Sequence, residues 1–258
     1  MNDPQGVSLS PVFEREFPVL FHDLDFKGHL GPETLLNFMQ TSAIMHSLAL
    51  GVSATNLRPQ GLTWVISRIH LVIERYPRAR EIVALRTWPA VREGLFTNRE
   101  FELNDGSGHP LARATTSWAL INIVSRRPVK LEGNLPPYPL LPRRAVDDNF
   151  APLPLFPGST APEVTFRVLR GDLDLNHHVN NTVYARWALE AVPDEVAAGN
   201  LTELEISFRA EVLYGETVVS RCAVQKAETA ICCLHQIINK RDNRELARLR
   251  TRWRSTKE

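Results

Sequence analysis

Cysteine is scarce in this sequence, long apolar runs are missing, and neither sign of charge prevails. Only three cysteines occur in 258 residues, and two of them, Cys232 and Cys233, are adjacent. Adjacent residues of a strand point to opposite faces, so a disulfide between these two is implausible and a reducing compartment fits best. No run of about 18 apolar residues is present, and residues 1–11 resemble neither a signal peptide nor a transit peptide. We therefore expect a cytoplasmic protein with no membrane insertion.

The charge balance argues against a nucleic-acid partner. Thirty basic residues face twenty-nine acidic ones, which leaves a formal net charge of +1 and no overall field to attract nucleic acid or anionic lipid. The sequence also lacks Gly-x-Ser-x-Gly, which argues against an α/β-hydrolase. The composition, 43% hydrophobic and 23% charged, is that of an ordinary globular protein. The length allows one large domain or two of about 100 to 150 residues.

The chain contains an internal repeat. Residues 23–30 read DLDFKGHL and residues 172–179 read DLDLNHHV, with four identical positions at an offset of 149. Each copy follows a strand-like segment and precedes a helix-like one, at 32–50 and 181–198. The similarity therefore extends from the motif to its context, which favours a duplicated unit over a chance match.

A second pair of segments matches later in each unit. Residues 112–118 read ARATTSW and residues 247–253 read ARLRTRW, at an offset of 135. The longer connection at residues 52–63 accounts for the difference between the two offsets.

A proline-rich segment separates the two units. Residues 130–163 contain eight prolines, a density that forbids a regular helix or a central strand. We interpret this segment as an extended, fairly stiff linker. The predicted organisation is a first unit at 1–129, the linker at 130–163 and a second unit at 164–258.

Each predicted unit has one long helix and several strands. Apolar residues alternate with polar ones through 204–212, which is the period of a half-buried strand. One helix followed by an antiparallel sheet that wraps it is an α+β arrangement. The later strands are expected at 64–73, 81–88, 97–103 and 111–124 in the first unit, and at 204–212, 217–224, 230–238 and 247–253 in the second.

The second copy of the repeat carries most of the side chains that could take part in catalysis. Residues 172–181 read DLDLNHHVNN and are followed by Tyr184 and by WALE at 187–190, while FRAE stands at 208–211. These stretches closely resemble the active-site region of acyl-acyl-carrier-protein thioesterases of the plant and bacterial fatty-acid type. Because those enzymes are tandem hot-dog proteins, the resemblance implies an α+β double hot-dog fold with two repeats, each with a long helix wrapped by an antiparallel sheet.

The resemblance makes Asp174, Asn176, His178 and Glu211 the candidate catalytic residues. It implies hydrolysis of the thioester of fatty acyl-acyl carrier protein by water, with release of the free fatty acid and with no cofactor and no metal. Alternate residues leave an extended segment on one side, so a carboxylate, an amide and an imidazole can converge on one small volume. The helix that follows would offer unpaired backbone N–H groups to the carbonyl oxygen.

Each of the four residues has an expected role. We take Glu211 as the general base for water, Asn176 and His178 as groups that position or polarise, and Asp174 as the residue that orients its neighbours. A covalent route through a carboxylate stays open, whereas Val212 stands where many plant members have a cysteine and so rules out a compulsory cysteine nucleophile. Strict alternation would turn Glu211 away from substrate, unless the strand is bulged there or the site lies where that face meets the other unit.

The first unit lacks two of the four residues, with Lys27 in place of Asn176 and Tyr76 in place of Glu211. We therefore expect it to be catalytically silent, and the resemblance implies that it contributes the acyl-chain cavity. Apolar residues of its helix that would line this cavity, or simply form core, are Leu35, Leu36, Phe38, Met39, Ala43, Ile44 and Met45. Basic residues that would meet an acidic carrier protein, or would simply be solvated, are Arg68, Arg75, Arg78, Arg80, Arg126, Arg127, Lys130, Arg143 and Arg144.

Several alternatives stay open. The chain could be an acyl-CoA thioesterase or a hydratase or dehydratase of the same fold, although no proline lies between Asn176 and His178 as the hydratase pattern would have it. It could also be a non-catalytic module that binds acyl chains or their carrier. Asp and His in close sequence proximity also allow a metal site. The expected partner is acyl carrier protein with a fatty acyl chain, and the chain is expected to be a monomer or a homodimer, because two units can pair their sheet edges internally.

Overall fold

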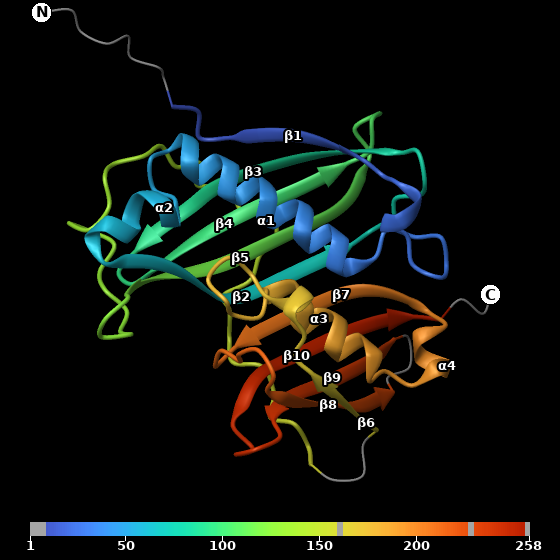
Figure 1. The fold of residues 1–258 in the computed structure, drawn as a ribbon. Helices are drawn as coiled ribbons and strands as arrows, with labels where there is room; N and C mark the ends of the chain where they lie inside the picture. Colours follow the sequence, from blue (N-terminus) through green and yellow to red (C-terminus); the bar gives the residue numbers. More distant parts are fainter. Residues whose placement is uncertain (1–8, 159–161, 227–229, 256–258) are drawn as a thin grey trace, which may run out of the picture.

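The computed structural model describes residues 9–158, 162–226 and 230–255. One antiparallel sheet of ten strands runs through it, in the order β1-β3-β4-β5-β2-β7-β10-β9-β8-β6 (Figure 1). The strands are β1 Phe13–Pro18, β2 Leu62–Ile73, β3 Ile82–Glu93, β4 Phe96–Asn104, β5 Pro110–Asn122, β6 Glu163–Arg167, β7 Asn200–Phe208, β8 Thr217–Lys226, β9 Ile231–Asn239 and β10 Glu245–Arg254. The helices are α1 Pro32–Ala49, α2 Ala54–Leu57, α3 Asn181–Glu190 and α4 Asp194–Ala197, with 3-10 turns η1 Phe21–Asp23, η2 Arg58–Gln60 and η3 Arg170–Asp172.

The strand order confirms the duplication. The five strands of the first half and the five of the second are arranged identically outward from the central β2–β7 pair. In that pair Arg68 lies opposite Ser207 and Val72 opposite Glu203. The two units therefore join edge to edge within one chain, as predicted, and each wraps one long helix in an antiparallel half-sheet.

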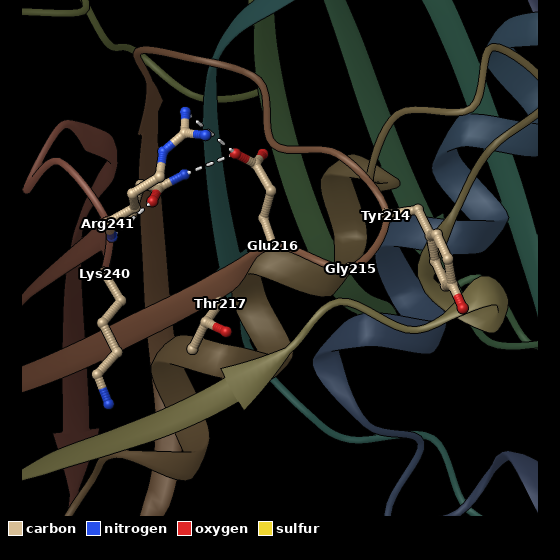
Figure 2. Close-up of a pocket in the computed structure, with 7 residues that line it drawn as sticks. Tyr214, Gly215, Glu216, Thr217, Lys240 and Arg241 are labelled. Atoms are coloured by element: carbon tan, nitrogen blue, oxygen red, sulfur yellow. Dashed lines mark hydrogen bonds and ion pairs between the residues drawn. The ribbon is translucent and has the colours of Figure 1, made fainter.

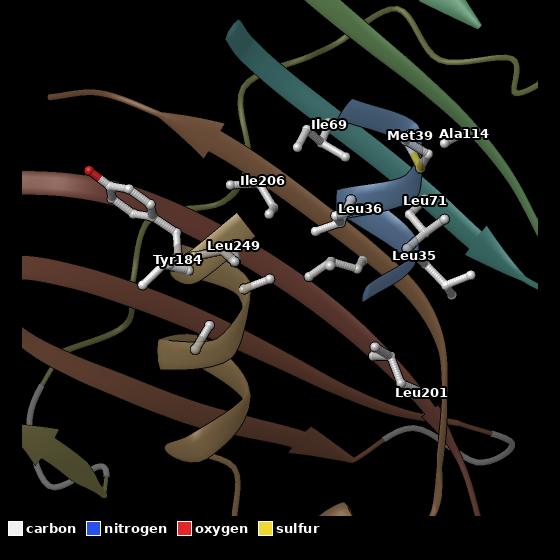
Figure 3. Close-up of a cluster of buried hydrophobic side chains, with 14 of the residues drawn as sticks. Leu35, Leu36, Met39, Ile69, Leu71, Ala114, Tyr184, Leu201, Ile206 and Leu249 are labelled. Carbon is white, nitrogen blue, oxygen red and sulfur yellow. The ribbon is translucent and has the colours of Figure 1, made fainter. Parts of the chain in front are cut away.

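The two long helices cover the same face of the sheet and share one core. Figure 3 shows Leu36 of α1 and Tyr184 of α3 on either side of Ile206, a residue of β7 that is fully buried. Helix α1 begins at Pro32, whose fixed φ suits a first helical turn and whose missing N–H costs nothing there. Among the described residues, no helix has the length and apolar character needed to cross a bilayer.

Two predicted elements end earlier than expected. The helix predicted at 181–198 is broken, because Pro193 follows the end of α3 at Glu190 and α4 begins only at Asp194. The strand predicted at 204–212 ends at Phe208. The other predicted strands agree with the structure within a few residues, except that β3 continues to Glu93.

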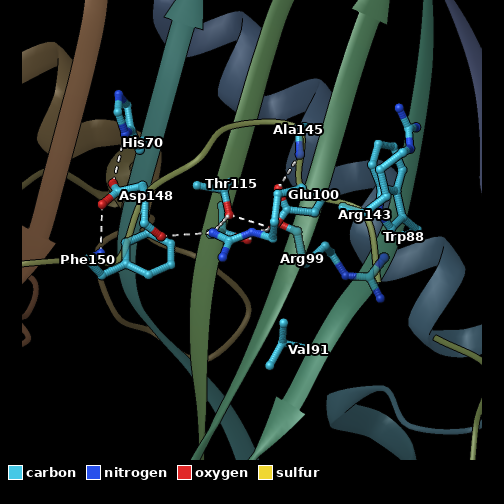
Figure 4. Close-up of polar contacts among 12 residues, drawn as sticks. His70, Trp88, Val91, Arg99, Glu100, Thr115, Arg143, Ala145, Asp148 and Phe150 are labelled. Carbon is cyan, nitrogen blue, oxygen red and sulfur yellow. Dashed lines mark hydrogen bonds and ion pairs between the residues drawn. The ribbon is translucent and has the colours of Figure 1, made fainter. Parts of the chain in front are cut away.

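The proline-rich linker packs against the sheet on the face opposite the helices. Glu100 of β4 is fully buried there, next in sequence to Phe101 of the helix-side core. Its carboxylate accepts hydrogen bonds from Arg144 Nε at 2.9 Å and from the Ala145 amide at 2.9 Å, both in the linker (Figure 4). No helix or strand occurs at residues 130–158 of the predicted linker, and β6 begins at its last residue, Glu163; residues 159–161 lie outside the described chain.

His70 ties the linker to both halves of the sheet. It stands on β2, its Nδ1 lies 2.8 Å from Asp148 of the linker, and its Nε2 lies 3.2 Å from Glu203 of β7. Burial opposes protonation of the ring, but hydrogen bonds and charge from Glu203, Glu205 and Asp148 outweigh it and raise the pKa of His70. The linker is therefore an anchored strap rather than a free spacer.

Candidate active site

Asp174 builds the loop that carries Asn176 and His178. Its Oδ1 accepts the backbone amides of Asn176 at 2.8 Å and His178 at 3.2 Å, and its own amide donates to the His178 carbonyl at 2.8 Å. Asp25 makes the same three contacts with Lys27 and His29 in the first unit. The aspartate makes the same contacts in both copies, so in each copy it shapes the loop.

The same loop explains one difference between the repeats. His177 adopts a φ of 62° and Gly28, its counterpart, a φ of 73°, so both occupy the left-handed region. Glycine enters that region without steric cost, and histidine at some cost. The His177 side chain is exposed, and among the described residues it belongs to no group of three or more side chains that could hold a metal ion.

The structure brings His178 and Glu211 together. His178 Nε2 lies 3.4 Å from Glu211 Oε2, and the two side chains are 39% and 37% exposed. Asn176 stands two residues away on the same loop, with its side chain exposed. An imidazole and a carboxylate thus meet at a partly open surface, and a carboxamide stands on the same loop as the imidazole.

A bulge turns Glu211 toward His178 and resolves the conflict with strict alternation. The amides of Arg209 and Ala210 both donate to the carbonyl of Leu246, at 2.9 and 3.2 Å, so two residues oppose one. The Tyr184 hydroxyl donates to the Ala210 carbonyl at 3.4 Å and so anchors the bulge from α3. Burial, followed by the charge of Glu211, raises the pKa of Tyr184 and keeps it a neutral donor.

Most of the backbone N–H groups at the start of α3, which were expected to be free, already donate hydrogen bonds. Asn180 caps the helix, with its side chain accepting from Thr182 N at 3.3 Å and its carbonyl from Val183 N at 3.0 Å. The loop amides of Asn176 and His178 are likewise engaged by Asp174. The side-chain amide of Asn176 is therefore the better candidate donor to a carbonyl oxygen.

Two arginines of the first half reach the site. Arg58 Nη1 donates to Asn176 Oδ1 at 3.5 Å, which leaves the amide NH₂ of Asn176 free to face a substrate. Arg126 Nη1 forms an ion pair with Glu211 Oε1. Arg126 was expected at most to meet a carrier protein and Arg58 was missed altogether, since no local pattern links residues that far apart in the sequence.

The corresponding position in the first half is closed by contacts within the chain. His29 stacks on Tyr76 with ring centroids 4.9 Å apart, and the Tyr76 hydroxyl donates to the Leu201 carbonyl at 2.8 Å. The Lys27 ammonium donates to the carbonyls of Ala197, the last residue of α4, and of Gly199. These contacts occupy the groups that would otherwise meet a substrate.

Other predicted basic residues are engaged in ion pairs. Arg143 Nη2 lies 2.9 Å from Glu102, Arg144 Nε lies 2.9 Å from Glu100, and Arg75 contacts Glu81 at 2.8 Å. Their charges are partly neutralised within the chain, which weakens the case for these three as carrier-binding residues.

Ligand-type side chains also gather beneath α3. Cys222, Cys233 and His235 are fully buried there, with their ligand atoms within 4.8 Å of one another. The hydrogen bond with Cys233, together with burial, raises the pKa of the Cys222 thiol, and His235 Nε2 is already paired with Thr251 Oγ1 at 2.8 Å. A protonated thiol and an engaged imidazole fit a packed core better than a metal centre.

Two surface pockets lie in the second half of the chain. One, of about 550 Å³, is lined by 214–217 and 239–241. Glu216 accepts a hydrogen bond from Asn239 Nδ2 at 3.0 Å, and Figure 2 shows its carboxylate close to Arg241. This pocket adjoins Leu213, which pairs with His178. The other, of about 470 Å³, lies between β6 and α3 and contains the Asp172–Arg186 ion pair.

Comparisons with known proteins match both halves of the chain. The profile described as "Acyl-ACP thioesterase N-terminal domain" matches residues 10–136, and that described as "Acyl-ACP thioesterase C-terminal domain" matches residues 159–255. A palmitoyl-acyl carrier protein thioesterase, chloroplastic, from Gossypium hirsutum is 28% identical over 98% of this chain and 67% of its own length.

Solved structures share the fold. The 12:0-ACP thioesterase from Umbellularia californica superimposes with a TM-score of 0.85 at 23% identity, over 97% of this chain and 99% of its own. An acyl-ACP thioesterase from Bacteroides thetaiotaomicron superimposes with a TM-score of 0.76 at 24% identity, over 94% and 98%. These likenesses confirm the predicted double hot-dog architecture.

Proposed function

The chain belongs to the acyl-ACP thioesterase family, and from this premise we infer that it hydrolyses the thioester of fatty acyl-acyl carrier protein to a free fatty acid and the carrier thiol. The observation that carries the inference is the approach of His178 to Glu211 at 3.4 Å, beside Asn176, in only one of the two units. A module that merely bound acyl chains would have no use for an imidazole–carboxylate pair open to solvent.

The reaction needs only water and these side chains. Glu211 Oε2 takes a proton from water as the water oxygen bonds to the thioester carbon, a role worth roughly 10²- to 10⁴-fold in rate. The Asn176 amide donates to the carbonyl oxygen as it gains negative charge, worth roughly 10²- to 10³-fold. The carbon–sulfur bond then breaks, and the proton held by Glu211 passes to the sulfur by way of His178.

Asp174 supports this chemistry without contacting the substrate. Its carboxylate already accepts two loop amides, so we assign it the task of holding Asn176 and His178 in place. The counterpart Asp25 does the same in the silent unit.

The apolar layer beneath α1 is our proposed acyl-chain site. Leu35, Leu36 and Met39 lie in this layer against β2 (Figure 3), and methionine adapts its shape readily to a flexible ligand. Ile44 and Met45 are 50% and 43% exposed on the outer face of α1 and therefore do not belong to it. Met39→Phe should shift the preferred acyl chain to a shorter length.

Thiol release from a panel of acyl-carrier-protein and acyl-CoA thioesters, from octanoyl to stearoyl, tests the function. We expect the wild type to prefer carrier-linked substrates and His178→Ala to lose at least about 10²-fold in kcat. His177→Gly is the matched control, because it removes a neighbouring exposed imidazole and suits the left-handed backbone. No release by the folded wild type would support a binding module instead, and a preference for CoA would support an acyl-CoA thioesterase.

The proposed compartment and assembly rest on the cysteines and on the central strand pair. We propose the cytoplasm, because Cys222, Cys232 and Cys233 are free thiols, as expected in a reducing compartment; the plant relative is named as chloroplastic. We propose a monomer, because β2 and β7 already make the edge-to-edge pairing that separate units would make between chains. Cell fractionation and light scattering test these two proposals.

A further inference from the structure

Glu211 uses its two carboxylate oxygens for different partners. Oε2 faces His178 Nε2 at 3.4 Å, and Oε1 is paired with Arg126 Nη1. A glutamate side chain that is 37% exposed has considerable rotamer freedom, so it needs a second contact to hold one orientation. Among the described residues, the only other arginine or lysine that contacts Glu211 is Arg244, whose Nη2 donates to the backbone carbonyl at 3.5 Å and not to the carboxylate.

Arg126 is presented by an unusual turn. The turn follows β5, and Asn122 Oδ1 accepts the amides of Val124 at 3.1 Å and Ser125 at 2.9 Å, while the Arg126 amide donates to the Asn122 carbonyl at 2.9 Å. Arg126 has a φ of 55°, a conformation that costs an arginine about 1 kcal/mol and that glycine would adopt freely. Such backbone strain is commonly retained where a side chain must be aimed.

The turn and Glu211 meet because of the sheet. Strand β5 pairs with β2, in which Leu62 lies opposite Asn122, and β2 pairs with β7, which leads to the bulge before Glu211. The end of the first half is therefore carried to the site of the second half.

We propose that Arg126 of the first unit is a positioning residue for the catalysis by Glu211, so that the silent unit completes the active site of the other. This inference rests on the proposed thioesterase function. The guanidinium holds Oε1, which fixes the carboxylate plane and leaves Oε2 directed at His178 and the attacking water. Misplacing a catalytic group by about 1 Å can cost roughly 10²-fold in rate.

Steady-state hydrolysis of an acyl-carrier-protein thioester by the wild type and three variants tests the proposal. Arg126→Gly removes the guanidinium and suits the backbone, so we expect kcat to fall by roughly ten- to a hundred-fold with KM changed by less than about twofold. Arg126→Lys should recover part of the loss, since an ammonium can still contact Oε1. Arg127→Ala removes the same charge from the same turn and so measures the contribution of that charge to carrier docking. The Arg127 side chain is exposed and does not contact Glu211 in the described chain, so its loss should change KM and leave kcat within about twofold of the wild type.

A double-mutant cycle separates positioning from docking. In the Glu211→Gln background, Arg126→Gly should reduce kcat little further, because its effect passes through the carboxylate. A rise in KM alone, or an equal effect of Arg127→Ala, would identify Arg126 as a carrier-docking residue and overturn the proposal. If neither the wild type nor Arg127→Ala releases any thiol, the thioesterase function fails and this inference fails with it.

Discussion

Replacing Glu100 by alanine should detach the linker from the sheet and strongly destabilise the fold. Glu100 is completely buried on β4 and accepts three hydrogen bonds: from Thr115 Oγ1 at 2.7 Å, from Arg144 Nε at 2.9 Å and from the Ala145 amide at 2.9 Å (Figure 4). Two of the three donors come from the linker, so this carboxylate is a principal anchor of the strap.

The magnitude follows from what the substitution leaves behind. Thr115 is fully buried and Ala145 is 6% exposed, so neither donor can turn to water. Each stranded donor costs about 1 to 3 kcal/mol, and removing one partner of a buried ion pair costs about 3 to 5 kcal/mol in all. We therefore expect Glu100→Ala to lower the free energy of unfolding by about 3 to 5 kcal/mol, and Glu100→Gln, which keeps the shape but loses the charge, by about 1 to 3 kcal/mol.

Urea unfolding followed by circular dichroism measures the loss as a lower midpoint at an unchanged slope. Glu14→Ala is the matched control, because Glu14 pairs with Arg86 at 2.8 Å while 65% exposed. An exposed pair contributes less than about 1 kcal/mol. A loss for Glu100→Ala no larger than that of Glu14→Ala would refute the view that a buried carboxylate anchors the linker.

Two further predictions concern the contact between the units and the core of the second unit. Lys27→Met keeps the aliphatic stem but removes two hydrogen bonds to the carbonyls of Ala197 and Gly199. Thermal unfolding should therefore show a free energy of unfolding lower by about 1.5 to 3 kcal/mol, while kcat at low temperature is retained. Loss of kcat instead would make Lys27 part of the reaction. Burial lowers the pKa of His235 from 6.5 to about 3, so only the unfolded chain takes up that proton as the pH falls below 6.5. The stability from His235 is complete above pH 6.5 and declines by about 1.4 kcal/mol per pH unit on acidification; His235→Gln should flatten the acid side of a stability–pH curve, and an unchanged slope would contradict the assignment.

Much of the architecture can be predicted from local patterns. The repeated Asp-Leu-Asp motif marks the same loop twice, since a short carboxylate that accepts the amides two and four residues ahead fixes its own turn. Helix α1 was predicted to within one residue of its end. The break after Glu190 was not predicted although Pro193 marks it, because apolar residues continue past the proline to Ala198.

In the candidate site, too, some features follow from local sequence and others from contacts between strands. Asp174, Asn176 and His178 are near neighbours in sequence, so their grouping was determined by the loop itself. The direction of Glu211 was decided by the bulge at Arg209 and Ala210, which depends on the Leu246 carbonyl of a neighbouring strand.

The sequence by itself determined the duplication, the α+β class, the helix starts and the loop that holds Asp174, because each of these depends on residues a few positions apart. Only the tertiary structure decided that Arg126 pairs with Glu211 and that the linker is hydrogen-bonded to the buried carboxylate of Glu100. Those contacts join residues separated by 85 and 45 positions, and they exist because edge-to-edge pairing of β2 with β7 brings the two units into one sheet. No local pattern in the sequence encodes that distance.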